Sequence, residues 1–266
     1  MKNNFVVFGT ILMIAATVAT SGAQGVSVFG SVGYGLGRGG TYIGSSRTFS
    51  NSGDLISNED HYASIGKGFK IDGGVQIAAA KSIAIRLGGG FSKMPAIEEK
   101  DTFSRSSETT TVNASFLHVD ALLLVKTDIG SSRLYGGAGG GLFFASRSSE
   151  FDERDDSDQS QLKYEGGFDP ALGFIGVAGI ELPLGGSNMG LFIEANLQQV
   201  SFLLTEEEIV EAKVNGRDVL NQVDIDSDTP GRQTVYKYEK DSTTKEEPEV
   251  VQGSNIGLRV GLRIGF

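Results

Sequence analysis

Residues 255–266 read NIGLRVGLRIGF, and this stretch decides the fold class of the 266-residue chain. Side chains of a β-strand alternate between its two faces. One face here carries only asparagine, glycine and arginine, whereas the other carries the apolar Ile256, Leu258, Val260, Leu262, Ile264 and Phe266. Such alternation also suits a strand of a soluble sandwich, but here the apolar face runs to an aromatic residue at the last position. We therefore expect 255–266 to be the closing strand of a β-sheet protein.

The rest of the chain supplies further alternating, glycine-rich or β-branched stretches and no helix of ordinary length. They are residues 25–36, 67–79, 83–92, 114–126, 133–145, 168–182 and 189–202. Each is about ten residues long or slightly longer, which suits a tilted strand that crosses a bilayer. Together with 255–266, the sequence predicts eight strands.

The connections between these strands alternate in length. Short turns fall at 80–82, 127–132 and 183–188, and long polar segments fall at 37–66, 93–113, 145–167 and 203–253. In an antiparallel sheet this alternation places the short turns at one end and the long loops at the other. In the last loop, Val214-Asn215-Gly216-Arg217 predicts a two-residue hairpin and 234–239 alternates like a strand, so ten strands remain an alternative to eight.

Ionisable side chains lie opposite the aliphatic face in these strands. In 114–126, for example, Leu123 shares a face with aliphatic neighbours while His118 and Asp120 lie on the other. A Lys or Arg on the lipid face costs roughly 2–4 kcal/mol at the bilayer midplane, so we expect the charged groups to lie inside a closed sheet. This polar cluster comprises Arg86, Asp120, Lys126, Glu181, Glu194, Arg259 and Arg263. We further expect Glu194 to pair with Arg259 or Arg263.

The chain contains no Trp, so aromatic belts at the two membrane surfaces would consist of Tyr and Phe. The candidates are Tyr34, Phe69, Phe91, Tyr135, Phe143 and Phe266. The glycines of 133–145 leave the direction of Tyr135 and Phe143 open.

Four stretches, GLRVGLRIGF, FIEANLQQ, GFIGVAGIEL and LYGGAGGGLFF, resemble strands of small bacterial outer-membrane β-barrels of the OmpA transmembrane-domain, OmpX and opacity-protein type. The resemblance covers nearly the whole chain after residue 23. It implies an all-β fold, an eight-stranded antiparallel transmembrane β-barrel with long extracellular loops, in the outer membrane of a Gram-negative cell. It also implies that the barrel-assembly machinery reads Phe266 and the apolar positions Ile264, Leu262, Val260 and Leu258 as an assembly signal.

Residues 1–23 have the form of a cleaved signal peptide. Lys2 gives a basic start, 5–19 form an apolar run, and Ser21-Gly22-Ala23 supplies small residues at a cleavage site. The apolar run is shorter than the roughly 20 residues of a membrane-spanning helix. We therefore expect 24–266 to be the exported outer-membrane barrel domain. The absence of cysteine excludes disulfides and thiol chemistry.

The acidic residues are concentrated in the four long loops, which hold 27 of the 33 Asp and Glu. Their charge argues against nucleic acid as a partner. We expect lipid and lipopolysaccharide around the barrel and an unknown extracellular ligand at the loops. Adhesion, surface binding or envelope integrity is the expected role, without enzymatic activity.

No cofactor motif is expected. Residues 35–40 match the G-x-G-x-x-G pattern, but a polar loop follows instead of the helix that would hold a pyrophosphate. The glycines of 136–141 are followed by Leu142 instead of the Lys of a phosphate loop. Asp224, Asp226 and Asp228 have half of the pattern of a calcium loop, with Thr229 in place of the turn glycine, and weak calcium binding stays open.

His118 and Asp120 are the residues to compare with lipid-modifying barrel enzymes, which use a Ser, His and acidic group at the membrane face. Both are expected to point inward, so polar packing inside the barrel is favoured and no catalytic residue is assigned. A lipid-modifying barrel enzyme and a small pore remain the alternatives. A lipocalin-like barrel is disfavoured because its interior is apolar, whereas Lys70 and Asp72 are expected to face inward here.

Overall fold

A computed structural model describes residues 25–50, 52, 55–103, 106–155, 158–185, 188–220, 235–237 and 250–265. The expected signal peptide, Phe266 and the aspartates Asp224, Asp226 and Asp228 lie outside the described residues. Within the described part, no helix is long and apolar enough to cross a membrane.

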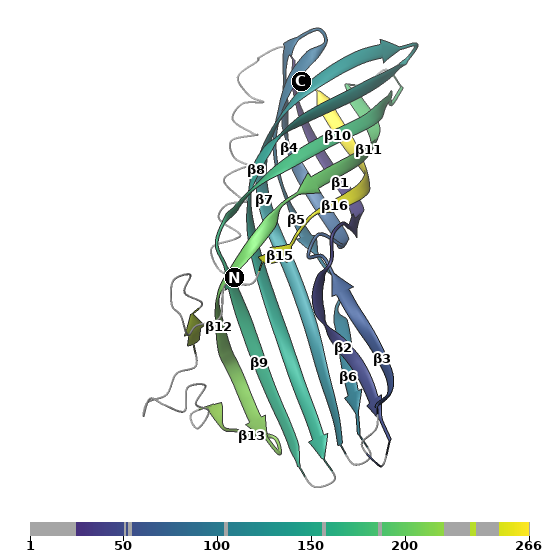
Figure 1. Ribbon diagram of the computed structural model, residues 1–266. Helices are drawn as coiled ribbons and strands as arrows, with labels where there is room; N and C mark the ends of the chain where they lie inside the picture. Colours follow the sequence, from purple (N-terminus) through teal and green to yellow (C-terminus); the bar gives the residue numbers. More distant parts are fainter. Residues whose placement is uncertain are drawn as a thin grey trace.

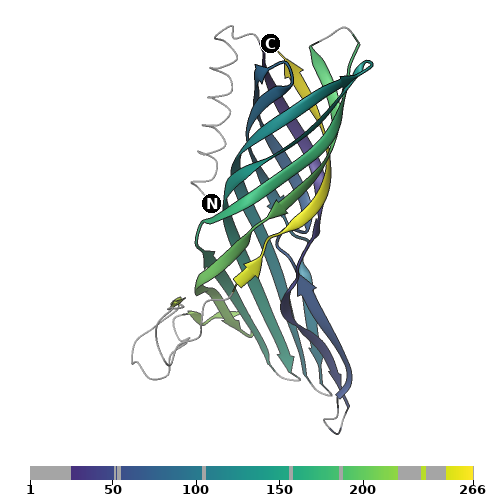
Figure 2. The ribbon, with the colours of Figure 1, turned by 45° about the horizontal axis from the view of Figure 1, so that its top comes forward.

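Eight strands form a closed ring in which each strand is antiparallel to both neighbours (Figures 1 and 2). The ring closes where the first strand pairs with the last, with Gly33 opposite Arg259. These are the eight strands that the sequence predicts. They are β1 (Val26–Gly37), β4 (Gly68–Ala80), β5 (Ile83–Lys93), β7 (Ser106–Ile129), β8 (Ser132–Asp155), β10 (Ala171–Pro183), β11 (Met189–Gln199) and β16 (Asn255–Gly265).

The two faces of the ring differ in chemistry, as the alternation predicts. On β16 the side chain of Leu258 is 65% exposed on the outside, while its neighbour Arg259 is 8% exposed and points inward. Exposed aliphatic and aromatic groups recur on the outer face of every ring strand; they include Val32, Tyr34, Phe69, Ile71, Ile85, Leu87, Leu123, Val125, Leu134, Phe144, Phe174, Ile193, Val260, Leu262 and Ile264. The outer surface of the ring is therefore an apolar band.

The expected aromatic belts need a correction. Tyr34 and Phe69 are exposed on the outer face, but Tyr135 and Phe143 are buried inside the ring. The pairing of Tyr135 with Lys126 and of Phe143 with His118 fixes this register, because directly paired residues in a sheet share a face. The glycines between them carry no such information in the sequence.

Strands β7 and β8 are 24 residues long, about twice the predicted length, and both continue beyond the ring. Their extensions form the centre of a second, open sheet, here named the projecting sheet (Figure 1). On one side of β8 lie β9 (Gln159–Phe168), β12 (Ser201–Val214) and β13 (Arg217–Asp218). On the other side of β7 lie β6 (Ile97–Thr102), β2 (Thr41–Phe49) and β3 (Leu55–Ala63).

The expectation of long polar loops is therefore wrong for the described parts of 37–66, 93–113, 145–167 and 203–253, which are largely strands. The alternative of ten ring strands is wrong as well, since β12 pairs with β9, outside the ring. Among the described strands, the pairing of β2 with β6 departs from the antiparallel pattern, because Thr48 and Thr102 form a parallel bridge.

The short turns lie where the sequence analysis predicts them. The short connections β4–β5, β7–β8 and β10–β11 lie at the end of the ring opposite the projecting sheet. In the predicted hairpin, Val214 pairs with Arg217, and Asn215 and Gly216 have φ of 49° and 75°. Positive φ at both central residues is the geometry that a two-residue hairpin requires. Strands β14 (Val235–Lys237) and β15 (Val250–Gln252) both pair with β12.

Candidate functional site

Inside the ring, Glu194 lies between two arginines from different strands. Its Oε2 accepts a hydrogen bond of 2.6 Å from Nη1 of Arg86 on β5, and its Oε1 accepts one of 2.6 Å from Nε of Arg259 on β16. A second nitrogen of Arg259, Nη1, lies 3.1 Å from Oδ2 of Asp72 on β4. The four charges thus form one network across the interior, and each anion is held by at least one cation.

His118 extends this network on β7. Its Nε2 lies 3.1 Å from Oδ2 of Asp120 and 3.4 Å from Oδ1 of Asp72. The ring of His118 also stacks on Phe143 of β8, with 5.4 Å between the ring centres. His118 is therefore a buried residue of the ring interior that packs between two carboxylates and an aromatic side chain.

The remaining members of the predicted polar cluster lie at the short-turn end. Arg263 donates to Glu181, with Nε 2.9 Å from Oε2. Lys126, Glu181 and Arg263 line a cavity of about 550 Å³ at this end. Of the two arginines expected to pair with Glu194, Arg259 does so and Arg263 does not, because four residues of strand separate them.

Toward the projecting sheet, the ion-paired part of the interior is followed by a layer of polar side chains around Lys70 and then by an apolar layer. Lys70 Nζ donates to Oδ1 of Asn255 at 2.5 Å and also hydrogen-bonds Gln198. Beyond it, Phe116 packs on Phe143 and on Phe202 of β12, with ring centres 5.8 and 6.0 Å apart. This apolar layer closes the end of the ring and includes the buried Ile65, Met94, Val200 and Val251. The sequence analysis did not identify it.

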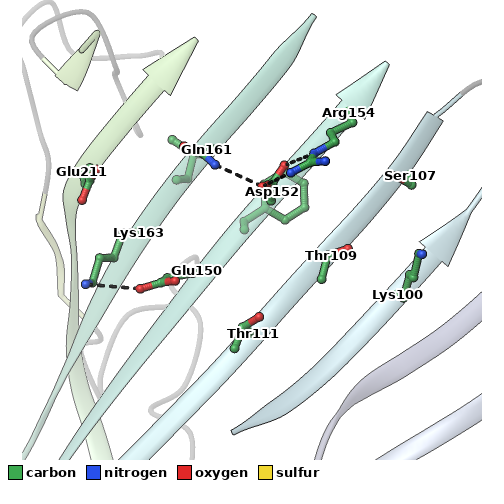
Figure 3. A pocket seen from close by; sticks show the side chains of 12 residues that line it. Lys100, Ser107, Thr109, Thr111, Glu150, Asp152, Arg154, Gln161, Lys163 and Glu211 are labelled. Carbon is green, nitrogen blue, oxygen red and sulfur yellow. Dashed lines mark hydrogen bonds and ion pairs between the residues drawn. The ribbon is translucent and has the colours of Figure 1, made fainter. Parts of the chain in front are cut away.

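A groove of about 580 Å³ lies on the projecting sheet (Figure 3). It crosses five strands, since its lining residues come from β6, β7, β8, β9 and β12. Three of its lining residues, Ser107, Thr109 and Thr111, carry hydroxyl groups and follow one face of β7. The other lining residues are Lys100, Glu150, Phe151, Asp152, Arg154, Gln161, Leu162, Lys163 and Glu211.

Charges within the groove are mixed and partly paired. Lys163 Nζ lies 3.3 Å from Oε1 of Glu150, and Gln161 Nε2 donates to Oδ2 of Asp152 at 3.1 Å. Burial acts to raise the pKa of Asp152, but hydrogen bonds from Gln161, Arg154 and Gln159 hold that pKa below its ordinary value. Asp152 therefore stays ionised to lower pH than an ordinary aspartate. The groove offers fixed anions, cations and hydroxyls to a polar ligand.

The groove was not predicted from the sequence. Its residues are contributed by strands that the sequence analysis took for loops, and they meet only through pairings such as Thr109 with Asp152 and Asp152 with Gln161. The only local signal is the run Thr109–Thr110–Thr111, whose β-branched side chains favour a strand. Among the described residues, no cluster of three or more His, Asp or Glu is arranged to hold a metal ion.

The four described members of the predicted assembly signal lie on the outer face of β16. They are Leu258, Val260, Leu262 and Ile264, all exposed. Each faces away from Arg259 and Arg263, so the last described strand carries one apolar and one cationic face.

Comparisons with known proteins return outer-membrane proteins among solved structures. No family model and no curated protein sequence matches. The chain is similar to the outer membrane protease OmpT from Escherichia coli, with 9% identity, a TM-score of 0.37, and coverage of 92% of this chain and 98% of that one. It is also similar to the translocator domain of the autotransporter NalP from Neisseria meningitidis, with 11% identity, a TM-score of 0.26, and coverage of 99% and 96%. A third match is OmpT, an outer membrane protein of Vibrio cholerae, with 11% identity, a TM-score of 0.18, and coverage of 90% and 76%.

These matches correct one expectation from the sequence. The protein was expected not to be an enzyme, and that expectation is contradicted because the first of the three solved structures is a protease. Similarity of fold at this level does not assign an activity. Whether this chain has chemistry of its own must therefore be argued from its own side chains.

Proposed function

We propose that the ring is a transmembrane β-barrel of a Gram-negative outer membrane and that the projecting sheet lies outside the cell. The supporting observation is the contrast between the two faces of the ring. Ile193, Leu258 and Leu123 are exposed outside, while Glu194 and Arg259 are buried inside. Water would favour burial of the apolar groups by roughly 25 cal/mol per Å², whereas a bilayer favours the arrangement found here.

The projecting sheet supports a role in binding at the cell surface. The groove of about 580 Å³ falls within the range of about 300–1,000 Å³ that is usual for ligand sites. Hydroxyls, an amide and both signs of charge line it, with Lys100 beside Thr109 and Thr111. Such a lining suits a sugar chain that carries phosphate or carboxylate groups, because sugar hydroxyls both donate and accept and Lys pairs with the anions.

The position of the groove indicates where such a ligand would come from. Thr111 lies on the same face of β7 as Leu117 and Leu123, which belong to the outer face of the ring. At about 3.3 Å per residue, Thr111 stands about 20 Å beyond Leu117. On our proposal the groove therefore faces the sugar layer above the lipid, and the glycan of neighbouring lipopolysaccharide is its ligand.

Isothermal titration of the detergent-folded natural protein with delipidated, phosphorylated lipopolysaccharide core oligosaccharide tests this role. We expect Lys100→Ala to weaken binding by roughly tenfold, because a charge-assisted hydrogen bond contributes about 1.5–3 kcal/mol. Lys81→Ala, in the short turn at the far end of the ring, is the matched control and should bind like the natural protein. Equal affinity of the Lys100 variant and the natural protein would exclude the groove as the binding site.

Cell fractionation and a heat-dependent shift on gels address the membrane assignment separately. A folded barrel resists unheated detergent and migrates differently after boiling. Recovery of the protein in the soluble fraction would contradict the assignment.

A further inference from the structure

At the edge of the projecting sheet, a serine and a histidine are held in direct contact. Oγ of Ser46 on β2 lies 2.8 Å from Nε2 of His61 on β3. In the hairpin Ser46 pairs with Glu59 and Gly44 with His61, so Ser46 and His61 lie on one face of the hairpin. Both are partly accessible to solvent.

The position of Ser46 is fixed by β6. The backbone amide of Lys100 donates to Oγ of Ser46 at 2.9 Å. Next to Ser46, the amide of Arg47 donates to Oδ1 of Asp101 at 2.9 Å, and Nη2 of Arg47 donates to Oδ2 at 2.7 Å. Because Lys100 also lines the groove, the Ser46–His61 pair lies at its β6 margin.

A half-buried carboxylate, that of Glu99, lies within electrostatic range of the pair. Glu99 precedes Lys100 on β6, and its Oε1 is buried without a hydrogen-bond partner. Burial raises the pKa of Glu99, and the charges of His61 and Arg147 counteract part of that effect.

We propose that Ser46 is a nucleophile and His61 its general base, and that together they hydrolyse carboxylic esters carried by polar molecules at the margin of the groove. A serine hydroxyl becomes nucleophilic when an adjacent histidine at about 2.6–3.2 Å takes its proton. The 2.8 Å contact meets this condition. The proposed ester hydrolysis does not depend on which glycan the groove binds.

The chemistry needs only water. Oγ of Ser46, which the amide of Lys100 holds in place, bonds to the ester carbonyl carbon as its proton moves to Nε2 of His61. The ester C–O bond then breaks, and the leaving alkoxy oxygen takes the proton from His61. Water gives a proton to His61 and attacks the acyl-serine; the Ser46–acyl bond breaks, Oγ regains the proton, and a carboxylic acid leaves.

A fluorophosphonate probe and p-nitrophenyl acetate test the proposal on the full-length protein folded in detergent. We expect mass spectrometry to find the phosphonyl group on Ser46, and Ser46→Ala to lose it. We expect His61→Gln to slow labelling and ester hydrolysis by about 10²–10⁴-fold, the usual contribution of a general base. Ser115→Ala is the matched control, because Ser115 contacts another hydroxyl, that of Ser146 at 3.0 Å, and should leave both rates unchanged.

Local unfolding of the hairpin is separated from loss of chemistry by amide hydrogen exchange on β2 and β3 in each variant. Absence of labelling at Ser46 in the natural protein, or equal labelling after Ser46→Ala, would overturn the proposal. If the His61→Gln variant keeps an intact hairpin and hydrolyses the ester as fast as the natural protein, His61 is not the general base. Binding of core oligosaccharide is measured in a separate experiment, so failure of the ester-hydrolysis proposal does not decide whether the groove binds a glycan.

Discussion

Glu194 and Arg259 are direct neighbours across β11 and β16, and Nε of Arg259 donates to Oε1 of Glu194 at 2.6 Å. The side chain of Glu194 is fully buried, and Arg86 approaches its other oxygen at 2.6 Å. One carboxylate therefore pairs with two arginines inside the ring. Removal of that carboxylate should cost more than removal of either arginine.

We predict that Glu194→Ala lowers the free energy of unfolding by about 3–5 kcal/mol, the usual cost of breaking a buried pair. A second change, Arg259→Ala, should recover part of this loss because it removes one of the two arginine charges that lose Glu194 as a partner. Urea unfolding of the detergent-folded variants measures both effects.

Arg263→Ala in the Glu194→Ala background is the matched control. Arg263 pairs with Glu181 and not with Glu194, so this second change should add its own loss. Strict additivity of the Glu194 and Arg259 effects would show that the two groups do not couple.

The outer face of β16 gives the second prediction. Leu258→Arg should destabilise the proposed inserted barrel by up to roughly 2–4 kcal/mol, the cost at the bilayer midplane, since it places a charge on the lipid-facing side of the apolar band. Leu55→Arg is the matched control, because Leu55 is equally an exposed leucine but lies on β3 of the projecting sheet. A cost of about 0.5 kcal/mol or less is expected there. Equal effects of the two changes in a lipid-vesicle unfolding assay would contradict the membrane assignment of the ring.

The third prediction concerns assembly. The apolar positions of β16 continue in the sequence to Phe266. Deletion of Phe266, or its replacement by Asp, should lower the yield of membrane-inserted protein far more than Gln252→Asp in β15. Quantification of heat-modifiable protein in outer-membrane fractions measures both yields. Similar yields would remove the support for an assembly signal at Phe266, Ile264, Leu262, Val260 and Leu258.

The ring could be predicted from the sequence because its two faces lie in different surroundings. Neighbouring residues such as Leu258 and Arg259 must differ sharply when one face is apolar and the other is packed with charges. In the projecting sheet this contrast is missing, and Thr109, Thr110 and Thr111 alternate between faces without changing chemistry. The sequence analysis therefore took strands of the projecting sheet for loops.

Pairing between distant strands could not be predicted in the same way. The sequence shows that both Arg259 and Arg263 oppose the apolar face, but only the register of β11 and β16 places Arg259 beside Glu194. A strand rises about 3.3 Å per residue, so Arg263 stands about 13 Å farther along. The contact of Ser46 with His61 likewise depends on the register of a hairpin whose strands carry little apolar alternation.

The last prediction is that the ring, inserted in a bilayer as we propose, does not conduct ions. An eight-stranded barrel is just wide enough to be occupied by its own side chains, whereas water-filled porins have about 16 strands. Here two layers lie in series along the interior: the ion-paired layer around Glu194 and the apolar layer around Phe116 and Phe202. Planar-bilayer recordings of the natural protein should show no stable single-channel current. Phe116→Ala combined with Phe202→Ala should also remain closed, because the charged layer is unchanged. A 16-stranded porin in the same bilayer controls for successful insertion, and large stable currents through the natural protein would contradict the closed interior and favour the pore alternative.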